Sequence, residues 1–208
     1  MPKGLNKEKN SVTIQRKGVK NMEMLAEVVT DFLLKKRYIT AEEKEVCRYG
    51  YAVLFSNLLG LFIIAIMSVL TGRIADGIVF AVVFVTTRKY SGGYHANTYL
   101  RCKLTVACVY CFYLILSAAI SEQDAGILCI MYILYMLCVI EKSPVENKNK
   151  PLDDEEKIKY HKISIMLGIV WGILSVIAGL CAYRYAVMVI TTLFCVAGLI
   201  LVASKTTM

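Results

Sequence analysis

Residues 49–70 read YGYAVLFSNLLGLFIIAIMSVL and contain no charged side chain. A helix of about 20 apolar residues crosses the hydrocarbon core of a bilayer, so this stretch predicts a membrane span. The whole chain has the same character, because 57% of its 208 residues are hydrophobic and its mean hydropathy is +0.58. Such a composition is typical of a membrane protein and not of a soluble domain.

Five further apolar segments follow the first, at residues 74–87, 104–120, 125–140, 163–181 and 185–203. The segment 74–87 is short for a span, and a re-entrant segment is the alternative there. We therefore predict an all-α fold, a polytopic membrane helix bundle of about six transmembrane helices that occupies residues 49–203.

The 48 residues before the first span are polar or amphipathic. Residues 1–20 show no periodicity and predict a flexible cytoplasmic extension. Within residues 21–48, apolar side chains recur at helical spacing and predict an amphipathic helix at the membrane interface, with packing under the bundle as the alternative. These apolar residues are Met24, Leu25, Val28, Val29, Phe32 and Leu33.

The basic residues are distributed asymmetrically between the predicted connections. Segments 1–48, 88–103, 141–162 and 204–208 hold 22 of the 24 lysines and arginines, and the opposite side holds only Arg73 and Arg184. By the positive-inside rule, both termini and the loop 88–103 are cytoplasmic in a multi-pass protein of the cell membrane. The net charge of +8 then predicts contact with membrane lipid and no nucleic-acid partner.

The cysteines and glycines of the spans are interpreted as packing residues. Most of the eight cysteines lie in apolar segments, where cysteine behaves as a small hydrophobe, and this applies also to the Cys108–Cys111 pair. We expect no metal site and no cofactor. Gly168 and Gly172 form a GxxxG pattern that is compatible with a homodimer, although this spacing is common in spans.

The loop 88–103, RKYSGGYHANTYLRCK, collects the reactive side chains. His95 and Cys102 form a candidate base and nucleophile, because an imidazole can take the proton of a thiol or stabilise its thiolate. One uninterrupted helix would hold these two residues about 10 Å apart, too far for direct proton transfer, so we expect a break between them or a pair that works across helices.

Other residues of this loop shape the candidate site. The positive charges of Arg88 and Lys89, together with Arg101 and Lys103, favour a thiolate. Gly92 and Gly93 allow close approach of a substrate. The polar side chains that could orient the imidazole or stabilise an oxyanion are Ser91, Tyr94, Asn97 and Thr98.

The second polar loop, residues 141–162, reads EKSPVENKNKPLDDEEKIKYHK. Its mixture of acidic and basic residues is typical of a solvated connection, and closure over a substrate is the alternative. His161 has no cysteine beside it in the sequence, and we interpret it as structural.

The run from Arg88 to Cys102 resembles the signature of the accessory gene regulator B (AgrB) family of quorum-sensing membrane peptidases. The N-terminal amphipathic region, about six spans and the proline-containing polar loop also resemble this family, over most of residues 22–203. The resemblance implies a cysteine endopeptidase with His95 as base and Cys102 as nucleophile, and with Arg88, Lys89 and Gly93 shaping the site. No third member of a triad can be named.

The implied substrate is a small pheromone precursor with an acidic C-terminal tail. Cys102 would cleave off the tail, hold the remainder as an acyl-thioester, and promote its cyclisation to a thiolactone or lactone. Two other classes stay open. A transporter or exporter of small peptides would need polar residues along its spans, where Asn57 and Asp76 are the main ones. A non-catalytic membrane scaffold would need neither His95 nor Cys102.

Overall fold

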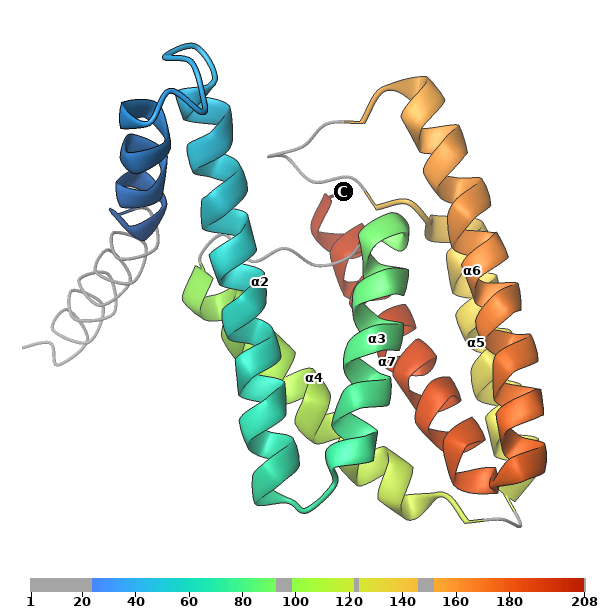
Figure 1. The fold of residues 1–208 in the computed structure, drawn as a ribbon. Helices are drawn as coiled ribbons and strands as arrows, with labels where there is room; N and C mark the ends of the chain where they lie inside the picture. The colour runs from blue at the N-terminus through green and yellow to red at the C-terminus, as the bar shows by residue number, and fades with distance from the viewer. Residues whose placement is uncertain (1–23, 93–98, 122–123, 146–151, 208) are drawn as a thin grey trace, which may run out of the picture. The chain divides into compact units, whose positions relative to one another are not determined.

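The computed structural model describes residues 24–92, 99–121, 124–145 and 152–207 (Figure 1). A short helix covers residues 24–35. It is followed by α2 (Lys44–Leu70), α3 (Ile74–Ser91), α4 (Tyr99–Ala119), α5 (Ala125–Lys142), α6 (Asp154–Cys181) and α7 (Tyr183–Thr207). Each predicted apolar segment lies in one of these six helices to within one residue. The all-α polytopic membrane bundle is therefore confirmed.

Five of the described helices, α2, α4, α5, α6 and α7, are long and apolar enough to cross a membrane, so the chain is a multi-pass membrane protein. The helix that corresponds to the short segment 74–87, α3, is not among them. Its 18 residues include Asp76, Arg88 and Lys89. At 1.5 Å per residue α3 measures about 27 Å, close to the thickness of the hydrocarbon core.

The chain forms two compact units, one of residues 1–63 with 96–107 and one of residues 64–95 with 108–208. In the first unit, Thr40 and Glu43 form a capping box before α2. The Thr40 N–H donates to Glu43 Oε2 at 2.9 Å, and the Glu43 N–H lies 3.4 Å from Thr40 Oγ1. Lys44 also pairs with Asp31 at 2.7 Å, which holds the helix 24–35 against the start of α2.

The helix 24–35 exposes an apolar stripe. Met24, Leu25, Val28 and Phe32 are 51–63% exposed, whereas Ala26 and Thr30 are fully buried. An exposed stripe of this kind is what a helix in the membrane interface presents to lipid. The helix covers only part of residues 21–48, because a turn with a positive φ at Arg37 separates it from α2.

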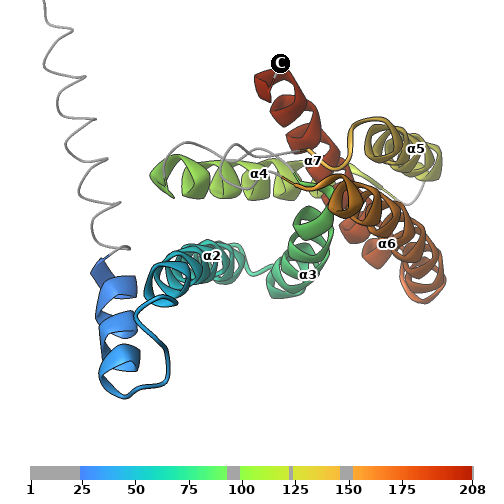
Figure 2. The ribbon, with the colours of Figure 1, turned by 90° about the horizontal axis from the view of Figure 1, so that it is seen from above.

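In the second unit, α7 is the central helix. Seen from above, α3, α6 and α5 lie around it (Figure 2), and each of the three packs against it. Leu128 and Met131 of α5 meet Val187 and Ile190 of α7 in a buried apolar cluster. Almost all of α7 from Ala186 to Ile200 is therefore buried.

Aromatic rings join α3 to α4 in the second unit. The ring of Phe80 lies 4.9 Å from the rings of Tyr110 and Tyr113, and 5.0 Å from that of Phe84. Such offset and edge contacts add to the free energy of burying the rings. They bring Tyr110 and Tyr113 of α4 into contact with Phe80 of α3.

The GxxxG pattern of α6 is used within the chain. A Cβ on Gly168 would meet Met136, and one on Gly172 would meet the hydroxyl of Tyr132, so both glycines let α5 approach closely. The Tyr132 hydroxyl donates to the Gly168 carbonyl at 3.1 Å. These glycines thus pack against α5, and the homodimer stays a prediction that draws no support from them.

Candidate active site

The C-terminal end of α3 carries the two basic residues that open the reactive loop. Arg88 is partly buried, and its guanidinium lies 5.4 Å from the centre of the Phe84 ring. Lys89 is exposed, with its ammonium 5.3 Å from the Tyr90 ring. Of the two, Lys89 presents its charge more openly to solvent, while Arg88 is partly committed to packing.

Directly after α3 the chain pairs with the start of the second polar loop. The Val145 N–H donates to the Ser91 carbonyl at 3.1 Å, and Gly92 and Val145 form a parallel bridge. The Ser143 hydroxyl donates to the same Ser91 carbonyl at 3.3 Å. We call Ser91–Gly92 with Ser143–Val145 the strap, because it ties the two polar loops together at one end of the second unit.

Only glycine fits at position 92 of the strap. Its φ of +74° is a conformation that residues with side chains rarely adopt, and a Cβ there would meet the backbone of Val145. Gly92 was predicted to allow close approach of a substrate. In the structure it allows the backbone of Val145 to approach closely.

The first turns of α6 hold the strap in place. The ring of Tyr160 contacts the ring of Tyr90 edge to face at 5.7 Å. Nδ1 of His161 lies 2.6 Å from the Ser143 carbonyl oxygen. Asp153 caps α6 by accepting from the Asp154 N–H, and the acidic residues of the first turn complement the helix dipole.

One candidate residue of the reactive loop, Ser91, has a role in the fold. The Ser91 hydroxyl is fully buried and donates to the Thr87 carbonyl at 3.0 Å, so it is not available to orient an imidazole.

Cys108 and Cys111 are both exposed, and both are free thiols. Among the residues that the structure describes, no group of three or more His, Cys, Asp or Glu side chains could hold a metal ion.

Cys102 belongs to the first unit and lies in the first turn of α4. Its thiol is free and partly exposed. The described part of α4 begins at Tyr99. His95 itself, with Gly93, Tyr94, Asn97 and Thr98, lies outside the described residues. The structure describes no side chain at Arg101.

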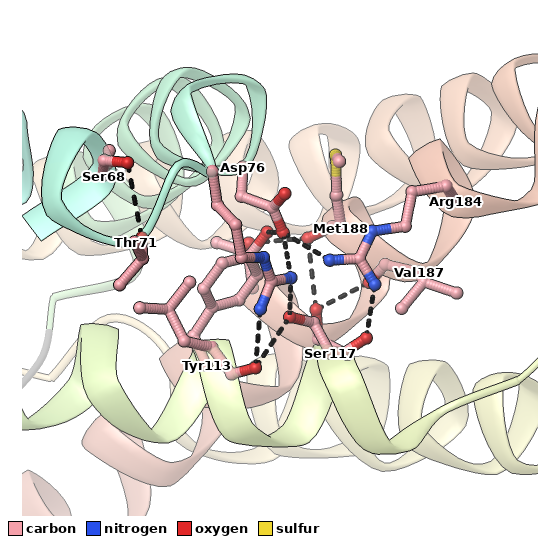
Figure 3. Close-up of polar contacts among 12 residues, drawn as sticks. Ser68, Thr71, Asp76, Tyr113, Ser117, Arg184, Val187 and Met188 are labelled. Atoms are coloured by element: carbon pink, nitrogen blue, oxygen red, sulfur yellow. Dashed lines mark hydrogen bonds and ion pairs between the residues drawn. The ribbon is translucent and has the colours of Figure 1, made fainter.

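A second polar cluster lies at the opposite end of α3. The Asp76 side chain is buried, and its Oδ1 accepts hydrogen bonds from Arg73, from Arg184 at 2.8 Å and from the Tyr113 hydroxyl at 3.0 Å (Figure 3). Two guanidinium groups around one carboxylate leave a net charge of +1. Buried charges require such pairing and hydrogen bonding.

The same two arginines bind the end of α4. Arg73 donates to the Leu114 carbonyl at 2.9 Å and to the Ser117 hydroxyl at 2.8 Å. Arg184 donates to the Ser117 carbonyl, one of the last four of α4, which has no donor within its own helix. Nearby, the Ser68 and Tyr110 hydroxyls share a hydrogen bond of 2.7 Å. The cluster of Asp76 and the two arginines therefore joins the ends of α3, α4 and α7.

Sequence reasoning named Arg73, Arg184 and Asp76 separately and missed that they form one cluster. The available signal was an acidic residue inside an apolar segment with an arginine three positions before it. For the strap, the sequence shows two residues typical of turns, Gly92 and the proline after Ser143. No sequence pattern indicates that the two segments lie side by side. The strap shows that the ends of α3 and α5 lie at one end of the second unit. The Asp76 cluster shows that Arg73 and Arg184 lie together at the other end of α3.

Comparison with known proteins agrees with these observations. The family model described as "Accessory gene regulator B" matches residues 26–204. An AgrB-like protein of Clostridium perfringens (strain SM101 / Type A) is 24% identical over 147 residues, which cover 68% of this chain and 69% of the relative. A second, AgrB-like protein 2 of Clostridium perfringens (strain 13 / Type A), is 22% identical with the same coverage.

No solved structure matches the chain significantly. The family match extends from the helix 24–35 through almost all of α7, and it includes both the strap and Cys102. With the multi-pass helical fold and the motif from Arg88 to Cys102, it shows that the chain belongs to the accessory gene regulator B family.

Proposed function

We propose that the protein is a membrane-embedded cysteine endopeptidase that matures a small pheromone precursor for quorum sensing. The observation that carries the proposal is the run from Arg88 to Cys102, with one histidine and one cysteine, inside a family match over residues 26–204. Cys102 is the nucleophile and His95 is the base. Both termini and the strap end of the second unit face the cytoplasm.

The position of Cys102 on α4 supports its role. The N-terminal end of a helix carries a partial positive charge that stabilises an anion, and Cys102 lies in the first turn. Its thiol is free and partly exposed, as a nucleophile must be to reach a substrate. Lys89, Arg88 and Lys103 surround this part of the sequence with positive charge, which attracts an acidic precursor tail.

The reaction follows from these two side chains. His95 takes the proton of Cys102, and the thiolate attacks the carbonyl carbon of the scissile peptide bond. The carbon–nitrogen bond then breaks, His95 returns the proton to the leaving amine, and the C-terminal tail departs. The remainder of the precursor stays on Cys102 as a thioester.

Cyclisation consumes that thioester. The thiol of a cysteine in the bound peptide attacks the acyl carbon, its proton passes to His95, and the Cys102 thiolate leaves. The product is a thiolactone, or a lactone where a hydroxyl attacks. Exchange of one thioester for another is close to neutral in free energy, so exclusion of water and loss of the tail decide the outcome.

The polar contacts of Asp76 weigh against the alternative of a peptide transporter. A transport pathway needs polar groups that a substrate can reach, and Asp76 is buried beneath Arg73, Arg184 and Tyr113. The scaffold alternative predicts that substitution of Cys102 and His95 changes nothing, and the same experiment tests it.

The test is cleavage of a synthetic precursor with an acidic C-terminal tail by the full-length protein in liposomes, followed by mass spectrometry. We expect the wild type to release the tail and to carry an acyl adduct on Cys102. Cys102→Ala and His95→Ala should release almost none. Cys108→Ala, which removes an exposed thiol elsewhere on α4, is the matched control and should cleave normally. Equal cleavage by all four proteins would refute the proposal.

A further inference from the structure

The cluster around Asp76 carries more positive than negative charge. Arg73 and Arg184 both bind Asp76 Oδ1, so these three side chains together have a net charge of +1. The Tyr113 and Ser117 hydroxyls, which complete the cluster, are neutral. A charge without a counterion is unfavourable in surroundings of low dielectric constant. An anion that reaches the two guanidinium groups would therefore be bound favourably.

Both guanidinium groups keep donors that the cluster does not use. Each carries five N–H donors. Arg73 donates to Asp76, to the Ser117 hydroxyl and to the Leu114 carbonyl, whereas Arg184 donates to Asp76 and to the Ser117 carbonyl. Described residues thus engage five of the ten donors, and the two arginine side chains remain 23% and 39% exposed. The planar fork of a guanidinium suits two-point contacts with an oxyanion such as phosphate.

Both arginines lie at the ends of membrane helices. Arg73 occupies the turn between α2 and α3, and Arg184 lies in the first turn of α7, shortly after the end of α6. The helices α2, α6 and α7 are long and apolar enough to cross a membrane, so their ends lie near the level of the lipid headgroups. The anions concentrated at this level are the phosphate groups of phospholipids.

Exposed apolar side chains adjoin the arginines in the sequence. Leu70 and Ile74, on the two sides of Arg73, are 79% and 56% exposed. Leu180, four residues before Arg184, is 84% exposed. In a membrane protein such side chains contact acyl chains, which a free phosphate ion lacks. The combination of arginines and apolar neighbours therefore favours a phospholipid over a free anion.

We propose that Arg73, Arg184 and Asp76 form a binding site for the phosphate of an anionic phospholipid, at the end of α3 opposite the strap. The net charge of +1 selects a headgroup of charge −1 over a zwitterionic headgroup, whose ammonium the arginines repel. The bound lipid neutralises the cluster and stabilises the joined ends of α3, α4 and α7. The inference is independent of the proposed peptidase function, because no residue of the site belongs to the loop 88–103.

Thermal unfolding of the full-length protein in a nonionic detergent tests the site. Dioleoyl phosphatidylglycerol, dioleoyl phosphatidylcholine and inorganic phosphate are added in parallel at one ionic strength. The two lipids have the same acyl chains and differ in headgroup charge. At a concentration about tenfold above its Kd, phosphatidylglycerol should raise the unfolding midpoint about 3–6 °C more than phosphatidylcholine does. Inorganic phosphate should raise it by less than about 1 °C.

Arg184→Gln removes one arginine of the site. Lys205→Gln is the matched control, because Lys205 is an exposed basic residue near the other end of α7. The shift is measured within each protein, with lipid minus without, so a general loss of stability cancels. Arg184→Gln should lose at least half of the difference between the two lipids, and Lys205→Gln should keep it.

Three results would overturn the proposal. An equal difference between the lipids in the wild type and in Arg184→Gln would place the anionic lipid elsewhere on the protein. Equal effects of phosphatidylglycerol and phosphatidylcholine on the wild type would show no preference for an anionic headgroup. An equal effect of inorganic phosphate would assign the site to a free anion.

Asp76→Asn tests the same site by a gain of binding and decides the matter if Arg184→Gln does not fold. Asparagine keeps an Oδ1 acceptor for the two arginines, and the net charge of the cluster rises to +2. The difference between the two lipids should then increase by about 2–4 °C over that of the wild type. An unchanged or smaller difference in Asp76→Asn would contradict the proposal.

Discussion

The two ends of α3 hold their polar groups in different ways. At the Asp76 end, three donors converge on one carboxylate oxygen, and two of them are charged. At the Ser91 end, a backbone carbonyl accepts one backbone N–H and one hydroxyl, and no ion pair is part of the strap contacts described. The first end depends on charge, and the second depends on backbone geometry.

This difference suggests different tasks for the two ends. A buried ion-pair cluster is costly to break, since removal of one partner leaves the others buried and unpaired, and it therefore fixes the ends of α3, α4 and α7 relative to one another. A backbone strap contributes less free energy and holds the C-terminal end of α3 beside Ser143–Val145. We expect substitutions at Asp76 to change stability above all, and substitutions at Gly92 to change activity above all.

The largest effect on stability is expected for Asp76→Ala. This change leaves Arg73 and Arg184 close together without a carboxylate, and should lower the free energy of unfolding by roughly 3–5 kcal/mol. Because 1 kcal/mol corresponds to about 2–4 °C at this chain length, the unfolding midpoint in detergent should fall by about 10 °C. Cleavage per folded molecule should change less than threefold.

Asp153→Ala is the control for Asp76→Ala. Asp153 is an exposed helix cap, and its loss should lower stability by only about 1 kcal/mol. If Asp76→Ala unfolds at the wild-type temperature, the cluster does not hold the helix ends. If it stays folded and loses cleavage, the division of tasks between the two ends of α3 is wrong.

The second prediction concerns Gly92→Ala. The methyl group would meet the Val145 backbone in a conformation that alanine rarely adopts, so the strap must open. The strain should cost roughly 1–3 kcal/mol of stability. The value of kcat for tail release should fall at least tenfold, because the end of α3 that carries Arg88 and Lys89 shifts. Gly50→Ala, on an exposed part of α2 with open space around it, should be neutral in both measurements.

The sequence was enough to predict the helices but not the contacts between them. Hydropathy and charge placement located six apolar segments, because the bilayer imposes length and apolarity on each span. The predicted break between His95 and Cys102 stays a prediction, because His95 lies outside the described residues. Apart from the Arg73–Asp76 pair, the strap and the Asp76 cluster join residues more than 35 positions apart, and no local pattern specifies which distant partner a polar residue will find.

The interpretations of His161 and of GxxxG illustrate the same limit. His161 was interpreted as structural because no cysteine adjoins it in the sequence, yet its partner, Ser143, is 18 residues away. Gly168 and Gly172 had two possible neighbours, a second copy or another helix of the same chain, and spacing alone does not distinguish them. The close approach of Tyr132 and Met136 shows that the neighbour of these glycines is α5.

The third prediction concerns Gly172→Ala. Gly172 lies on α6, away from both ends of α3. The methyl group would push against the Tyr132 hydroxyl and separate α5 from α6, at a cost of roughly 1–3 kcal/mol. The oligomeric state in detergent, measured by light scattering, should stay that of the wild type. Gly198→Ala on α7, with open space around it, is the control. Loss of a dimer without loss of stability would instead show that the glycines form an intermolecular face.

The smallest expected effect is a pH dependence outside the spans, at Asp124. Hydrogen bonds from the Ser121 backbone N–H and hydroxyl hold the pKa of this exposed carboxyl below its ordinary value of 3.8. A lowered pKa in the folded state stabilises the fold above the unfolded pKa, and this contribution is lost as the pH falls through the folded pKa.

Asp124→Asn keeps an acceptor for Ser121 and removes the titration. Between pH 6 and pH 3 the wild type should therefore lose slightly more stability than Asp124→Asn, measured as the shift of the unfolding midpoint in the same detergent. All other carboxylates are common to both proteins, so the difference reports Asp124 alone. Parallel curves would mean that the Ser121 contacts bind the charged and the neutral carboxyl equally well. The contacts of Asp124 with Ser121 would then contribute no pH-dependent stability, and any acid sensitivity of the protein would arise elsewhere in the chain.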